Sequence, residues 1–317
     1  MVHNHIRLLS SLKCSLFIFA FSSVIQAANV PLSFDHLTLE ISSERYEYFP
    51  LEPIEVTVTL HNATDQPVLG HYLIDTAGLF EFMIGQNESD LRLFKSANEQ
   101  PNARPAQPHI FLPAEDRSVR EVLSYGWHDD RRINGLYLFD KPGIWYIKGA
   151  LEDLDRTKRI ESNTITIRVV APSSDDAEAL AYLSRYLDRE NLLMKAILPW
   201  PSKMSNETVG VLKQLIEKHP DSRYAQYARK TLGSAYILGY GGNRSEGIEI
   251  LKSALKYDNS WVKKRILDQL VSEHLKMKDP IGAKEYALQL QANFPHSREA
   301  EGSIRTVEDY IAKTADE

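Results

Sequence analysis

The chain has 317 residues, of which 43% are hydrophobic and 25% charged, and its formal net charge at pH 7 is −6. This acidic balance, with no basic stripe along the sequence, argues against nucleic acid as a partner. The single cysteine, Cys14, excludes an intrachain disulfide, and it lies in a segment that we expect to be removed. We expect neither a cofactor nor a bound metal ion.

Residues 1–27 have the pattern of a cleaved secretory signal peptide. Arg7 and Lys13 give a positive start, an apolar run extends from Cys14 to Ile25, and Ala27 offers a small-residue cleavage site. An uncleaved anchor is the alternative, but the run of about 12 residues is shorter than the roughly 20 that a spanning helix needs. We therefore expect a periplasmic or secreted protein without an integral membrane segment after cleavage.

Residues 28–172 show the period of antiparallel strands. Apolar and polar side chains alternate from Ile54 to Leu60 and again from Ile165 to Val169. Such alternation gives each strand one buried and one solvated face. Turn residues, including those at 62–67 and 141–143, separate the runs, and this spacing is typical of a β-sandwich.

Three segments of this part resemble bacterial immunoglobulin-like modules. Tyr46–Asn62 resembles their opening, Phe139–Ile147 their penultimate strand and Ser162–Val170 their last strand. The resemblance implies an immunoglobulin-like sandwich and says almost nothing about function. Two positions depart from it: Leu51 stands where a turn glycine is common, and Trp145 stands where the tyrosine of the corner motif is often found.

A proline-rich stretch within residues 95–132 predicts a long irregular loop. Its polar residues could form a metal or acid–base site of an enzyme or enzyme accessory, and Pro101–Pro113 could instead act as the loop of a protease inhibitor. We favour an exposed polar loop, because adjacent side chains do not easily converge on one ion. The candidates of the alternative site are His109, His128, Asp129 and Asp130.

Residues 173–317 change to the period of helices. Ser173 and Asp176 offer a cap and a first-turn acid directly after the last strand. Asp279 followed by Pro280 is a strong helix start, and Ser297 is expected to cap the final helix. The pattern therefore predicts an all-α domain at 173–317, following a β domain at 28–172.

Two junctions in this half are alike, at 217–222 and 292–297, and their prolines lie 75 positions apart (295 − 220). This distance accommodates two helix pairs of about 34 residues. The half resembles the tetratricopeptide repeat, and a generic helical bundle is the alternative because His274 fits the repeat poorly. The residues that carry the resemblance are Leu232, Gly233 and Tyr236 in a first helix, and Gly247, Leu251 and Ala254 in a second.

The resemblance implies binding of a protein or peptide segment. We therefore expect a non-catalytic interaction or scaffold protein of the bacterial cell envelope, whose helical surface takes the segment. Tyr236 also fits a packing role, and Trp200 lies in a Pro-Trp-Pro sequence that fits either a covering loop or an exposed binding element. The candidates for the binding surface are Tyr227, Lys230, Tyr236 and Trp200.

Overall fold

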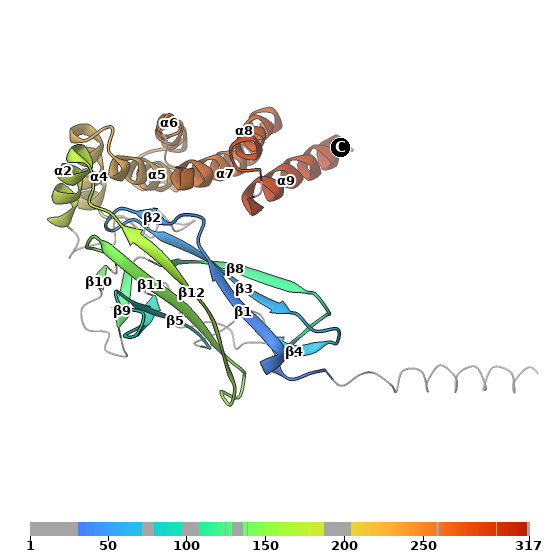
Figure 1. Ribbon diagram of the computed structural model, residues 1–317. Coiled ribbons are helices and arrows are strands. Elements are labelled where there is room, and N and C mark those ends of the chain that lie inside the picture. Colours follow the sequence, from blue (N-terminus) through green and yellow to red (C-terminus); the bar gives the residue numbers. More distant parts are fainter. Residues whose placement is uncertain are drawn as a thin grey trace, which may run out of the picture. The chain divides into compact units, whose positions relative to one another are not determined.

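The computed structural model describes residues 31–71, 79–96, 108–123, 125–128, 136–137, 139–186, 204–257, 260–295 and 297–315 (Figure 1). Within these ranges, strands occupy the first part of the chain and helices the second, with the change between Val169 and Ser174. The prediction of a β-rich part followed by a helical part is confirmed at this level. The predicted signal peptide, residues 1–27, lies outside the described residues.

The strands follow a short 3-10 helix, η1 (Phe34–His36). They are β1 (Leu37–Ser42), β2 (Glu47–Tyr48), β3 (Ile54–Asn62), β4 (Val68–His71), β5 (Phe80–Gly85), β6 (Arg92–Ser96), β7 (Pro108–Phe111), β8 (Asp116–Leu123), β9 (Tyr125–His128), β10 (Leu136–Tyr137), β11 (Gly143–Glu152) and β12 (Arg159–Val169).

The helices are α2 (Ser174–Ser184), α4 (Asn206–Lys218), α5 (Arg223–Ile237), α6 (Arg244–Ala254), α7 (Ser260–Lys276), α8 (Pro280–Asn293) and α9 (Arg298–Ala315). In the part of the chain that the structure describes, none of them is both long enough and apolar enough to cross a membrane.

The chain divides into two compact units, and the first consists of residues 1–43, 56–121 and 146–165. In this unit β1 pairs with β3 antiparallel, with Leu39 opposite Leu60 and Ile41 opposite Val58. These four side chains are buried, as the alternation in the sequence predicts. The sheet order continues from β3 to β8, while β6, β5, β11 and β12 are successive neighbours and β4 pairs with β7.

The expected immunoglobulin-like sandwich is wrong. The described strands form small sheets of mixed direction, and β2 pairs parallel to β12 through Glu47–Arg168 and Tyr48–Val169. Alternation of apolar residues shows which face of a strand is buried, but it does not determine which strands become neighbours. The segment around Tyr46–Asn62 that carried the resemblance is in fact divided, with residues 44–55 belonging to the helical unit.

The second unit consists of residues 44–55, 122–145 and 166–317. Its helices begin at the predicted signals: the Asp279 carboxylate accepts a hydrogen bond from the Gly282 amide at the start of α8, and the Ser297 hydroxyl accepts one from Ala300 at the start of α9. Side chains at these positions satisfy amides that have no partner within the helix. The start signals at Asp279 and Ser297 are therefore confirmed, whereas Ser173 precedes α2 without a capping hydrogen bond from its side chain.

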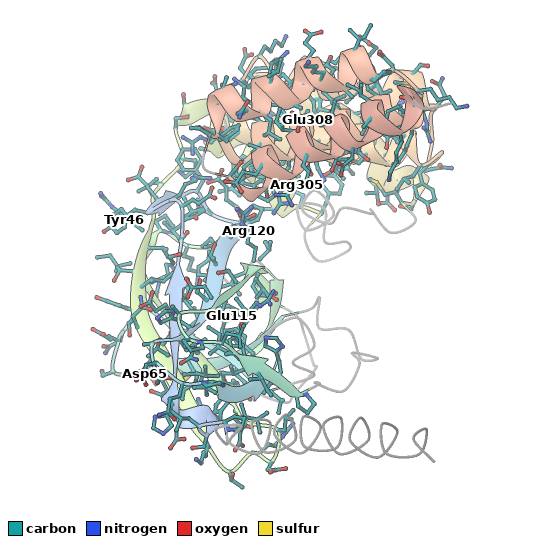
Figure 2. All side chains as sticks on the ribbon, turned by 90° about the vertical axis from the view of Figure 1, so that its right-hand side faces the viewer. Tyr46, Asp65, Glu115, Arg120, Arg305 and Glu308 are labelled. Atoms are coloured by element: carbon teal, nitrogen blue, oxygen red, sulfur yellow. The ribbon has the colours of Figure 1, made fainter. Side chains whose placement is uncertain are left out.

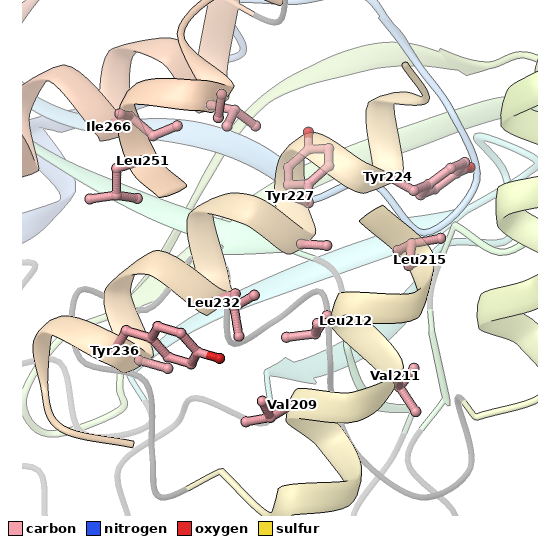
Figure 3. Packing of buried hydrophobic residues seen from close by; sticks show 14 of the residues in the cluster. Val209, Val211, Leu212, Leu215, Tyr224, Tyr227, Leu232, Tyr236, Leu251 and Ile266 are labelled. Atoms are coloured by element: carbon pink, nitrogen blue, oxygen red, sulfur yellow. The ribbon is translucent and has the colours of Figure 1, made fainter. Parts of the chain in front are cut away.

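The core of this unit is formed by α4, α5, α6 and α7 (Figure 3). Val209, Leu212 and Leu215 of α4 face Tyr224, Leu232 and Tyr236 of α5, and the cluster continues through Leu251 of α6 and Ile266 of α7. At the crossing of α5 and α6, a Cβ atom on Gly247 would lie 2.6 Å from the Gly233 carbonyl oxygen. The two backbones can therefore meet only because both positions are glycine.

The expected tetratricopeptide-like stack is also wrong. Such a stack exposes one face of its first helices, whereas every residue of α5 from Tyr224 to Ile237 is buried. Part of the cover comes from residues 44–55, which we call the strap. Tyr48 and residues 50–55 of the strap are themselves buried, and Phe49 is partly buried. The helical unit thus includes a non-helical segment from the β-rich half of the sequence, which no repeat pattern predicts.

A strained turn holds the strap in the core of this unit. The Glu52 amide donates to the Phe49 carbonyl at 3.1 Å, closing a turn with Pro50 at its second position and Leu51 at its third. Leu51 has a φ of 65°, which a type II turn requires and which glycine adopts most easily. Leucine remains there because its side chain is only 3% exposed and packs in the helical core.

Replacing Leu51 by glycine tests whether this packing outweighs the strain. Relief of the left-handed conformation would raise the free energy of unfolding by about 1–2 kcal/mol. Loss of a buried leucine side chain would lower it by about 2–5 kcal/mol. We expect Leu51→Gly to lower the free energy of unfolding in urea by about 2 kcal/mol. Arg156→Gly is the matched control, because Arg156 has a φ of 57° and is exposed; it should leave stability unchanged or raise it. Equal effects of the two substitutions would contradict the account.

Candidate functional site

The candidate site is the contact between the strap and helices α5 and α7, where two carboxylates are buried. Glu52 is fully buried, and its two oxygens accept hydrogen bonds from the Phe49 amide at 2.8 Å, Arg45 at 3.0 Å and the Tyr227 hydroxyl at 3.2 Å. Arg223 of α5 lies 3.9 Å from the same carboxylate. The negative charge of Glu52 is thus compensated within the unit, as a buried charge requires.

Aromatic rings surround this first carboxylate. The guanidinium of Arg45 lies 4.4 Å from the centre of the Tyr48 ring, and that of Arg223 lies 4.3 Å from the centre of the Phe49 ring. The Tyr224 hydroxyl donates to the Pro50 carbonyl at 2.8 Å, and burial together with the nearby Glu52 raises the pKa of Tyr224. Helix α5 therefore contacts the backbone of the strap turn at Pro50 and the side chains of Phe49 and Glu52.

Glu55 forms a second centre against α7. Its carboxylate accepts a hydrogen bond from the Trp261 indole at 3.0 Å and pairs with Arg265 at 2.5 Å, while Lys264 lies 3.7 Å away. Burial raises the pKa of Glu55, but the charges of Arg265 and Lys264 outweigh it, and the pKa of Glu55 lies below its usual range. Glu55 is therefore ionised in the folded protein.

The cations of α7 also contact other acids. Lys264 is only 1% exposed and donates to both oxygens of Glu44, at 2.9 and 2.7 Å, and Arg265 pairs with Glu299 of α9 at 3.3 Å. Because each carboxylate is held by a cation or by several donors, the arrangement suits anchoring of a chain segment. A general acid or base must instead be able to gain or lose a proton during turnover.

Lys230 of α5 lies beside this network and is 3% exposed. Burial lowers the pKa of its ammonium group, and the positive charge of Arg265 lowers it further, to about 7. An unfolded lysine has a pKa near 10.4. Between about pH 7 and pH 10 the unfolded chain therefore binds more protons than the folded chain, and Lys230 makes stability rise with pH in this window.

Three of the four predicted surface residues are buried. Tyr227 and Tyr236 have no exposed surface, and Lys230 has almost none. The sequence shows them at helical spacing on α5, but it does not show that the strap covers part of this helix. Trp200 lies outside the described residues.

The residues of the alternative loop site are described only in part. His109 lies on β7 of the first unit, 3.3 Å from Glu115, whose carboxylate also accepts from the Leu112 amide and Arg117 (Figure 2 labels Glu115). The Leu112 amide is the largest cause that lowers the pKa of Glu115. His128 ends β9, but its side chain and both aspartates at 129 and 130 lie outside the described residues. In the described part of the chain, no group of three or more His, Cys, Asp or Glu side chains could hold a metal ion.

The residues that make the strap contact, chiefly Glu52 and Glu55, were not predicted from the sequence. Glu55 lies in the alternating run from Ile54 to Leu60, which predicts a half-solvated strand, so it was expected to face water; Glu52 precedes this run and was given no role. The available signal was Leu51, a leucine at a turn position that favours glycine, which indicates that a side chain is needed there.

Comparison with known proteins does not place the chain in a family. No model of a known family matches it, and no curated protein sequence matches it. Neither the immunoglobulin-like nor the tetratricopeptide-like resemblance therefore receives support from these comparisons.

Similarity to solved structures is weak. A β-glucosidase from Listeria innocua is 12% identical over 43% of this chain and 16% of its own, with a TM-score of 0.24. A β-glucosidase from Erythrobacter marinus is 17% identical over 42% of this chain and 15% of its own, also with a TM-score of 0.24. A sporulation control protein from Bacillus subtilis is 11% identical over 47% of this chain and 55% of its own, with a TM-score of 0.25. The chain thus matches under two thirds of the length of each of these proteins, and the similarities carry no functional argument.

Replacing Lys230 by methionine tests the electrostatics of the site. Methionine fills a similar volume without the charge, so we expect Lys230→Met to be more stable than the native protein at pH 6, by about 1–4 kcal/mol. The difference should shrink as the pH rises from about 7 to 10, because the native lysine is then neutral in the folded state and the cost of deprotonating it on folding falls as the pH approaches the unfolded pKa. Urea unfolding across this range measures it. The control Lys313→Met, at an exposed position of α9, should not change the pH dependence. Lower stability of Lys230→Met at every pH would contradict the assignment.

Proposed function

We propose that this protein is an exported, non-catalytic interaction or scaffold protein of the bacterial cell envelope, and that its helical unit binds a segment of a partner protein. The predicted signal peptide supports export. The helical unit supports the binding role.

The observation that carries this proposal is the strap itself. The helical unit already holds an extended polypeptide segment, and it does so with buried ion pairs, tyrosine and tryptophan donors and stacked guanidinium groups. Tyrosine, tryptophan and arginine are the side chains that contribute most at protein–protein interfaces. Helices that recognise one segment of the chain in this way have the chemistry needed to recognise a segment of another protein.

The ionisable groups at the strap favour binding over catalysis. Glu52 and Glu55 each accept several hydrogen bonds, and Lys264 and Arg265 are engaged with carboxylates. Charge-assisted hydrogen bonds of this kind fix the geometry of the contact between segments. Because the strap occupies this face, a partner would have to use another surface of the helical unit.

Site-specific photocrosslinking in the producing cell tests the proposal. A photoreactive phenylalanine analogue would replace Ile281 on α8, Arg305 on α9 or, as a control in the first unit, Leu69 on β4. All three side chains are exposed (Arg305 is labelled in Figure 2). We expect the same protein adduct from at least one helical position and none from position 69. Adducts from position 69 alone, or no adduct from any position in a folded protein, would contradict a binding role of the helical unit.

A further inference from the structure

We draw no further inference here: the strongest candidate, the exposed apolar patch that Leu69 of β4, the opposite Ile110 of β7 and the adjoining Leu112 form on the first unit, carries none because nothing in the part of the chain that the structure describes shows what covers it.

Discussion

The helical unit depends on two buried carboxylates, Glu52 and Glu55, that the strap brings to α5 and α7. Removing one partner of a buried ion pair costs about 3–5 kcal/mol, because the remaining charge is then uncompensated. Since the partners lie on different segments, Glu52 and Glu55 reach Arg223 on α5 and Arg265 on α7 only when the strap is in place. The ion pairs therefore select one position for the strap, while apolar burial supplies most of the favourable free energy.

This constraint explains why α5 has buried polar residues along its length. Tyr224 and Tyr227 direct their hydroxyls to the strap, and Ser234 donates to Gln269 of α7 at 2.7 Å. An ordinary surface helix would present such residues to water. With α5 enclosed, an exposed surface for a partner must come from other helices, and α8 exposes Ile281 and Leu288. The binding hypothesis thus moves from the face that the sequence suggested to a different helix.

Local features of the fold were predictable and long-range ones were not. The alternation around Val56–Leu60 and the start signal at Asp279–Pro280 depend on neighbouring residues, and both are confirmed. The contact between Glu55 and Arg265 joins residues 210 positions apart, and no local pattern encodes it. The same limit explains why Tyr227 and Lys230 were taken for a binding surface: helical spacing places them on one helix, but the cover comes from a distant segment. The resemblances failed for this reason, because each rested on local patterns.

Hydrogen exchange of the strap amides tests the central claim most directly. The amides of Phe49, Leu51 and Glu52 each donate to an acceptor within the helical unit. We expect them to exchange as slowly as the amides in the middle of α5, because both are released only when the unit opens. Exchange as fast as that of the exposed turn at residues 86–89 would show that the strap is not part of the helical unit, and would contradict the account.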